Sequence, residues 1–189
     1  MKTWTFIAPT ESRSLSFPEM QNNALAVGVI FKKAKWSPNA IAGMLGNMQA
    51  ESTINPSRWE NDDDEEKGGY GLVQWTPYTK YSDWAGDGWE RNGVKECERI
   101  LYEMHNNLQW IATDEYPISF AEYSTMHKNP EYMADVFLKN YERPENPNQP
   151  MRGEYADYWY KYILKYLYPN VWLYFQWDKY YRKELRKKI

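Results

Sequence analysis

Apolar residues recur at helical spacing along most of the chain, and short stretches rich in proline, glycine or small polar residues interrupt them. Residues 9–18 contain two prolines and four serines or threonines, which predicts an irregular lead-in to a helix at 19–35. Ser37 is a favoured N-cap and Pro38 suits the first helical position. A second helix is therefore predicted to run from there to about Thr53.

The pattern changes after this second helix. An acidic stretch at 60–66 leads through glycines into "YGLVQWT" at 70–76, where apolar and β-favouring residues predict one short strand or hairpin. Periodic apolar positions then return, with breaks at glycines and prolines. The fold class predicted is mainly α, with a small β-hairpin element. The further helices are expected at 77–85, 93–112, 117–128, 131–141 and 151–168.

Length and the end of the last predicted helix indicate the domain organisation. A chain of 189 residues is long enough for one well-cored domain, which we place at 1–168 because Pro169 ends that helix. Tyrosines and Trp159 recur in the helix at spacings of three and four, so it presents an aromatic stripe to a core or a partner. Residues 169–189 are predicted to form an amphipathic, helical C-terminal extension rich in aromatic and basic residues.

Composition narrows the class of function. Tyrosine and tryptophan are over-used, at 17 and 10 copies, and rings with polar edges suit sugars and interfaces. The net charge of -3 argues against nucleic-acid binding, because the visible basic cluster lies only near the C-terminus. Cys97 is the single cysteine and the chain has two histidines, so we expect no disulfide, no metal site and no cofactor.

The hydropathy pattern also bears on location. No run of 18 apolar residues occurs, and the N-terminus lacks the apolar core of a signal peptide. We therefore expect no transmembrane segment, and delivery by other means if the protein works outside a cell.

Glu51 stands out because it shares the apolar face of the second predicted helix. At 100° per residue it lies close to Met44, Met48 and Ile41, and it falls in the last turn, where the helix dipole opposes a negative charge. Partial burial adds to this effect, and both favour the protonated form that a general acid in glycosidic cleavage needs. The alternative is a structural glutamate that accepts hydrogen bonds from loop amides.

Three segments, "AGMLGNMQAESTINP", "YGLVQWT" and "NYERPENP", together resemble the phage tail lysozyme family, which is related to goose-type lysozymes and lytic transglycosylases. The similarity spans roughly residues 25–165. It implies a lysozyme-like fold, a location at the phage tail tip in the virion, and bacterial peptidoglycan as substrate. Glu51 would be the general acid of a muramidase that cuts the β-1,4 bond between N-acetylmuramic acid and N-acetylglucosamine.

The same resemblance implies roles for neighbouring residues. Ser52 would orient the acid or the substrate, and Gln74 would hydrogen-bond a sugar from the β element. Tyr70 and Trp75 are candidates for stacking on pyranose rings, with a place in the core as the alternative. Tyr141 and Glu142 fall where related enzymes place a cleft-lining aromatic. Glu142 could instead simply pair with Arg143.

Hydrolysis normally needs a second carboxylate, about 6.5 to 9.5 Å from the acid for inversion and about 5 to 5.5 Å for retention. Asp64, in the middle of the acidic stretch and near the β element, is the candidate chosen here. Lytic transglycosylases dispense with this group, because a hydroxyl of the muramic acid attacks instead. Both routes stay open from the sequence.

A non-catalytic reading of the whole chain also stays open. A tail structural protein or wall-binding module could keep the fold and the aromatic sugar contacts without turnover. The extension at 169–189 suits attachment to an anionic surface or docking on phage tail proteins, and its alternative is a final helix packed on the domain.

Overall fold

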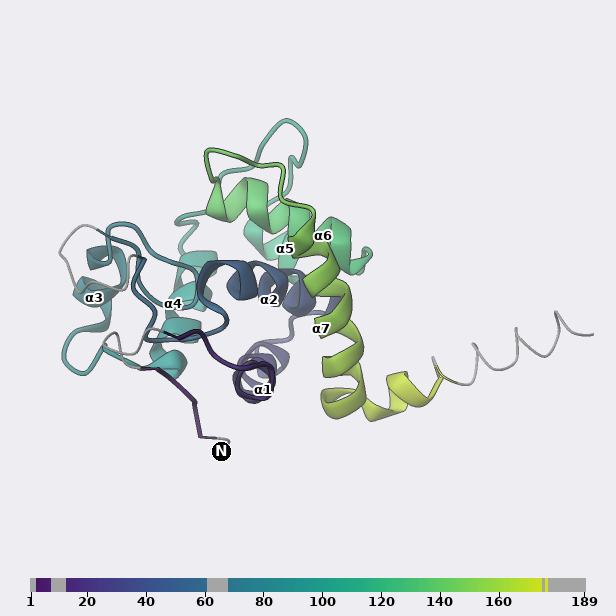
Figure 1. Cartoon of the computed structure of the whole chain (residues 1–189). Helices are drawn as coiled ribbons and strands as arrows, with labels where there is room; N and C mark the ends of the chain where they lie inside the picture. The colour runs from purple at the N-terminus through teal and green to yellow at the C-terminus, as the bar shows by residue number, and fades with distance from the viewer. Residues whose placement is uncertain (1–2, 8–12, 61–67, 175, 177–189) are drawn as a thin grey trace, which may run out of the picture.

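The computed structural model describes residues 3–7, 13–60, 68–174 and 176, and its architecture is mainly helical (Figure 1). Seven α-helices and one π-helical turn follow one another between Phe17 and Leu167 in the described part of the chain. They are α1 (Phe17–Lys33), α2 (Pro38–Ser52), α3 (Thr79–Ala85), α4 (Gly93–His105), α5 (Phe120–Thr125), α6 (Pro130–Phe137), the π-helical turn η1 (Leu138–Glu142) and α7 (Met151–Leu167).

Local capping explains why the first two helices start where they do. The side chain of Ser37 accepts a hydrogen bond from the amide of Ala40 at 3.0 Å, and Pro38 occupies the first turn of α2, as predicted. Ser16 and Glu19 form a capping box at the start of α1. A few adjacent residues therefore determine where each of these two helices begins.

The predicted helix at 93–112 is shorter in the structure, because α4 ends at His105. Asn107 and Gln109 have left-handed backbones, with φ of 53° and 61°, which a continuing helix cannot contain. The predicted helix at 117–128 is likewise trimmed to α5, which begins after the capping residue Ser119.

The predicted β-hairpin at 70–76 is wrong. Tyr70 and Trp75 exchange two backbone hydrogen bonds, at 3.2 and 3.0 Å, but this pair is an isolated bridge and not part of a strand. The four residues between them form a turn in which Gly71 and Gln74 have φ of 80° and 49°. A second isolated bridge joins Tyr70 to Trp59. Left-handed residues so close to these bridges prevent a ladder from extending.

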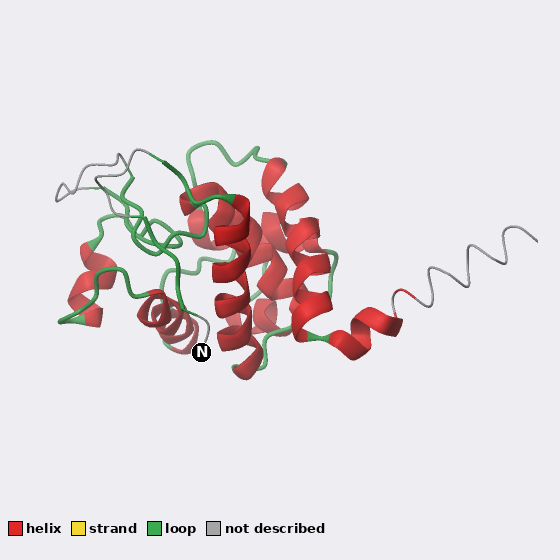
Figure 2. Cartoon of the chain, turned by 60° about the horizontal axis from the view of Figure 1, so that its bottom comes forward, coloured by secondary structure: helices red, strands yellow, loops and turns green. Residues whose placement is uncertain are grey.

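The helix α2 lies at the centre of the molecule, with α7 and α6 packed on it and α1 crossing nearby (Figures 1 and 2). Its residues from Asn39 to Met48 are all buried. Glycine makes the contact with α7 possible: a Cβ at Gly46 would lie 2.9 Å from the backbone nitrogen of Ala156 and closer still to the carbonyl oxygen of Arg152. The two helix backbones therefore meet here without an intervening side chain.

Aromatic residues build much of the core, and this role accounts for their abundance in the sequence. One cluster of rings in mutual contact lies around the 70–75 turn and α3, and a second surrounds α5 and η1. The first is Trp59, Tyr70, Trp75, Tyr78, Tyr81 and Trp89, and the second is Trp36, Trp110, Phe120, Tyr123, Phe137 and Tyr141. These rings hold the fold together, so their number alone is not evidence of sugar binding.

The chain continues beyond α7 as a short helical stretch at 169–174, which turns away from the domain (Figure 1). Val171, Leu173 and Tyr174 are exposed on it, at 48%, 64% and 70%. From residue 177 onward, the predicted extension lies outside the described residues. None of the helices that the structure describes is long and apolar enough to cross a membrane.

The glycine contact between α2 and α7 gives a first prediction. Gly46→Ala is expected to lower the free energy of unfolding by about 1 to 3 kcal/mol, because the added methyl must displace the backbone of α7. Chemical denaturation measures this change. Gly153→Ala in α7 is the matched control, since its Cβ would meet Glu131 no closer than 3.3 Å and alanine favours helix. An equal loss in both variants would contradict the tight contact.

Candidate functional site

Glu51 lies in the last turn of α2, and the end of this helix is firmly anchored. Thr53, the C-cap, has a left-handed backbone with φ of 56°, and its amide bonds back to the helix. Ser52 donates its hydroxyl to the carbonyl oxygens of Met48 and Leu72, both at 3.0 Å. The serine thus ties the end of α2 to the 70–75 turn, and its predicted orienting role stays a prediction.

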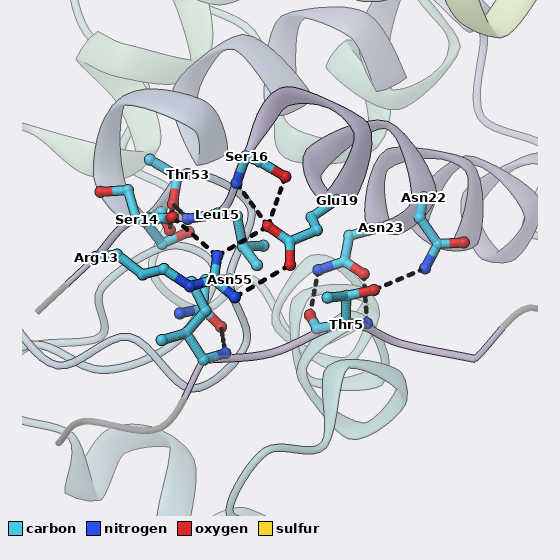
Figure 3. A network of polar contacts seen from close by, with 12 residues as sticks. Thr5, Arg13, Ser14, Leu15, Ser16, Glu19, Asn22, Asn23, Thr53 and Asn55 are labelled. Carbon is cyan, nitrogen blue, oxygen red and sulfur yellow. Dashed lines mark hydrogen bonds and ion pairs between the residues drawn. The ribbon is translucent and has the colours of Figure 1, made fainter. Parts of the chain in front are cut away.

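The segment after α2 is also held by the N-terminal residues and by α1 (Figure 3). The side-chain amide of Asn23 in α1 donates to the carbonyl oxygens of Thr5 and Ile54, at 2.6 and 2.8 Å. Thr53 accepts a hydrogen bond from the amide of Leu15 at 3.3 Å. These bonds fix where the backbone leaves α2 and so limit where Glu51 can point.

Arg152 is the direct partner of Glu51. Its Nη2 lies 2.5 Å from Oε1 of Glu51, and the two side chains are 6% and 21% exposed. Nη1 donates to Oδ1 of Asn47 at 3.0 Å, and Nε donates to Gln149 at 2.8 Å. Periodicity in the sequence places Glu51 on an apolar face but carries no sign of this cation. In the structure a guanidinium compensates the carboxylate.

Gln74 occupies the turn that faces η1. Its left-handed backbone directs the side-chain amide inward, where it donates to the carbonyl oxygens of Arg58 and Gly71 at 3.0 and 2.8 Å. It also lines a hollow of about 170 Å³ together with Tyr141 and Glu142. Its predicted contact with a sugar stays a prediction, with the carbonyl oxygen of the side chain as the group left to make it.

The three aromatic candidates lie in the core. Tyr70, Trp75 and Tyr141 are only 2%, 2% and 1% exposed. The hydroxyl of Tyr70 accepts a hydrogen bond from the amide of Arg91 at 2.9 Å, and Trp75 stacks on Tyr81. This arrangement matches the core alternative for Tyr70 and Trp75, because neither ring has a free face to offer a sugar.

Glu103 in α4 joins two of these aromatics and was missed from the sequence. It accepts hydrogen bonds from Trp75 Nε1 at 3.0 Å, from the hydroxyl of Tyr141 at 2.5 Å and from Nε of Arg99 at 2.9 Å. Burial raises the pKa of Glu103, while these donors act in the opposite direction. A carboxylate with three donors is satisfied, so we read Glu103 as a structural link between α4, the turn and η1.

Glu142, at the end of η1, has a different environment. Part of the residue reaches solvent, but its Oε1 atom is buried and has no hydrogen-bond partner among the described residues. Burial raises the pKa of Glu142 well above its usual value, and the negative charge of Glu51 raises it further. This carboxyl therefore keeps its proton to higher pH than an exposed glutamate does.

The expected alternative partner of Glu142 does not pair with it. Arg143 donates instead to the backbone carbonyls of Asn140 and Tyr141, both at 2.9 Å, and to that of Gln109. The left-handed backbone of Arg143, with φ of 52°, turns the chain at the end of η1. A Glu142–Arg143 ion pair is thus excluded as the explanation for the position of Glu142.

The hollow beside Glu142 adjoins a second hollow, which in turn adjoins a third. The second, of about 390 Å³, also has Arg143 in its wall, and it shares Lys139 and Pro147 with the third, of about 560 Å³, between α6 and the start of α7. Arg152 lines this largest hollow. The depressions thus follow one another over the loop after η1, with Glu142 in the wall of the first and Arg152, the partner of Glu51, in the wall of the last.

Asp64, the candidate for the second catalytic carboxylate, lies outside the described residues. Its role stays a prediction.

Comparison with known proteins places this geometry in a family. Residues 22–163 match the family model described as phage tail lysozyme, which is about three quarters of the chain. The chain belongs to the phage tail lysozyme family. The mainly helical fold described above, with Glu51 at the end of α2, is therefore that of a phage tail lysozyme domain.

One relative adds context to the phage tail lysozyme assignment. The chain is 47% identical over 154 residues to "Morphogenesis protein 1" of Bacillus phage B103. The match covers 78% of this chain but only 40% of that protein. The chain thus spans well under half the length of the relative.

The turn that carries Gln74 gives a second prediction. Gly71→Ala would combine a left-handed φ of 80° with a Cβ 2.5 Å from Oε2 of Glu96, a fully buried carboxyl that accepts a hydrogen bond from the amide of Leu72. We expect a loss of about 2 to 4 kcal/mol in the free energy of unfolding. Gly88→Ala is the control, because it has a similar φ of 72° and nothing within 4 Å. If both variants unfold alike, the packing of Glu96 against the turn is refuted.

Proposed function

We propose that this chain is a peptidoglycan-cleaving glycosidase that cuts the β-1,4 bond between N-acetylmuramic acid and N-acetylglucosamine, with Glu51 as general acid. The observation that carries the proposal is a partly exposed Glu51 carboxylate held by Arg152, which lines one of the adjoining hollows, with a second carboxyl, that of Glu142, in the wall of another. Two carboxyls in unlike environments are the usual equipment for acid–base work on a glycosidic bond. Membership of the phage tail lysozyme family supports the same substrate.

Exposure supports Glu51 rather than Glu142 as the group that meets the sugar. The side chain of Glu51 is 21% exposed, whereas Oε1 of Glu142 is buried. A general acid must come within hydrogen-bond reach of the bridging oxygen. Glu51 would protonate that oxygen as positive charge develops on the sugar ring.

The hollows lined by Glu142 and by Arg152 would hold neighbouring sugars of the glycan. Gln74 lines the hollow beside Glu142, and Ser52 keeps the turn of Gln74 close to α2. We propose Gln74 as the sugar-binding group and Ser52 as the residue that orients the site. Tyr70, Trp75 and Tyr141 would shape the wall from behind.

The route after protonation has two forms. In hydrolysis a second carboxylate, proposed as Asp64, activates water, and in a lytic transglycosylase the 6-hydroxyl of the muramic acid attacks instead. Mass spectrometry of digested walls distinguishes them, because ordinary reducing ends mark hydrolysis and anhydromuramyl ends mark the transglycosylase.

We also propose that the protein acts as part of the virion, at the tail tip. The family description and the name of the B103 relative support a role in the phage particle. Residues 169–189 would dock on other tail proteins or on the wall, and the exposed Leu173 and Tyr174 at the start of this segment support such a contact.

Replacement of the proposed acid gives a third prediction. Glu51→Gln is expected to reduce the rate of peptidoglycan digestion by about 10²- to 10⁴-fold at neutral pH, because the amide cannot donate an acidic proton. Release of soluble muropeptides from purified walls measures the rate. Glu98→Gln is the matched control, since Glu98 lies on the exposed face of α4 and should leave the rate unchanged.

The same variant separates the enzyme from a non-catalytic wall-binding protein. A binder would keep its affinity for walls after Glu51→Gln and would show no digestion in the parent chain. Full digestion by the Gln variant would refute Glu51 as the acid.

Deletion of residues 170–189 gives a fourth prediction. We expect unchanged cleavage of soluble glycan fragments, because the deleted residues follow the last helix of the domain, and at least tenfold weaker attachment to whole walls or to phage tails. Co-sedimentation with walls and incorporation into virions measure attachment. Unchanged attachment would instead favour a final helix without a docking role.

A further inference from the structure

We propose that Arg152 is a positioning residue, which holds one oxygen of the Glu51 carboxyl so that the other oxygen faces the glycan. Asn47 and Gln149 hold Arg152 in turn and are positioning residues at one remove. The roles of all three residues rest on the proposed function of Glu51 as general acid.

The guanidinium of Arg152 uses a different nitrogen for each of three partners. Nη2 donates to Oε1 of Glu51 at 2.5 Å, Nη1 to Oδ1 of Asn47 at 3.0 Å, and Nε to Oε1 of Gln149 at 2.8 Å. These nitrogens lie in one rigid plane. The two amide partners therefore fix the orientation of the plane, and with it the direction in which Nη2 meets Glu51.

Asn47 is itself fixed by backbone groups of two helices. It lies on the same face of α2 as Glu51, one helical turn earlier, and it is fully buried. Its Nδ2 donates to the carbonyl oxygens of Gly43 in α2 and Ala134 in α6, both at 3.0 Å. Both hydrogens of the amide are then in use, so its oxygen points in one direction, toward the arginine.

Gln149 restrains the same guanidinium from the loop before α7. Its Nε2 donates to the carbonyl oxygen of Asn146 at 2.8 Å, which leaves Oε1 to accept from Nε of Arg152. Gln149 is half-buried and lines the largest hollow together with Arg152. It can therefore be replaced without opening the core between α2 and α7.

The contact with Arg152 leaves the second oxygen of Glu51 for the substrate. Oε1 accepts from Arg152, and no other residue that the structure describes forms a hydrogen bond with this carboxyl. The side chain is 21% exposed, so a glycan can reach Oε2. A carboxylic acid can accept at its carbonyl oxygen while its hydroxyl donates. Glu51 can thus stay bonded to Arg152 while Oε2 gives its proton to the bridging oxygen.

Replacement of Gln149 tests the proposal without disturbing the core. Methionine is similar in size to glutamine but cannot accept from Nε of Arg152. Because about 1 Å of misplacement can cost a reaction about a hundredfold, we expect Gln149→Met to lower kcat roughly ten- to a hundredfold with KM unchanged. Initial rates on soluble glycan fragments measure both constants. Gln149→Glu keeps an acceptor for Nε and should stay within about twofold of the parent kcat.

A matched control removes a similar hydrogen bond between the same two helices. Gln49 in α2 accepts from Nε1 of Trp159 in α7 at 2.8 Å, and its partner is not the arginine. Gln49→Met should therefore leave kcat and KM at the parent values. An equal loss of kcat in the two Met variants would indicate a general effect of helix packing and overturn the positioning role. A rise in KM alone after Gln149→Met would overturn it as well, since Gln149 would then only bind sugar.

Arg152→Lys separates orientation from charge. Lysine keeps the positive charge but has one nitrogen in place of the planar fork, so kcat should fall roughly tenfold or more with KM unchanged. Gln149→Met added to Arg152→Lys should then cost less than about a further twofold, because Gln149 acts through the arginine. Parent kcat in the lysine variant, or additive losses in the double variant, would refute the proposal.

The outcomes for the proposed function and for the positioning role are separable. If Glu51→Gln keeps full activity, the proposed function itself fails. If Glu51→Gln is inactive while Gln149→Met and Arg152→Lys both keep the parent kcat, Glu51 remains the acid and only the positioning role is refuted. Unchanged denaturation midpoints in Gln149→Met and Gln49→Met establish that the rates compare folded proteins.

Discussion

The close contact between α2 and α7 determines where charge can lie in the candidate site. Gly46 lets the backbone of α7 approach α2, and the same contact brings the Arg152 side chain to Asn47 and Glu51. A larger residue at position 46 would move the guanidinium along with its helix. The packing of two helices and the electrostatics of the site are therefore one constraint, and the glycine is as much part of the site as the charged groups.

Buried carboxyls in this protein differ in what compensates them. Glu103 accepts three hydrogen bonds and links the 70–75 turn to η1, and Glu96 accepts the amide of Leu72 beneath the same turn. Glu51 is compensated by a guanidinium. Glu142 alone among these four combines a buried, unpartnered oxygen with a place in the wall of a hollow. The first two arrangements link elements of the fold, while Glu51 and Glu142 are the two carboxyls left for the proposed chemistry.

Local signals in the sequence predicted the helix starts but not the site. Ser37 and Pro38 act on the residues beside them, so the start of α2 could be read directly. The hairpin prediction failed because the left-handed backbone of Gln74 cannot be recognised from its residue type, whereas that of Gly71 can. The pairing of Glu51 with Arg152 joins residues 101 positions apart, and periodicity carries no information on such contacts. Many of the aromatic residues pack in the core, and composition alone cannot distinguish this role from sugar binding.

The burial of Glu142 also constrains the step that follows protonation. A base that activates water in an inverting hydrolase must touch that water on the face of the sugar opposite the acid. The Oε1 of Glu142 is buried, and the raised pKa of this carboxyl leaves less of it in the ionised form that a base needs. The attacking group must then be activated from elsewhere, either by a carboxylate such as Asp64 or by the substrate through its own hydroxyl. Glu51 thus accounts for the acid alone, and the choice between hydrolysis and transglycosylation depends on the opposite side of the site.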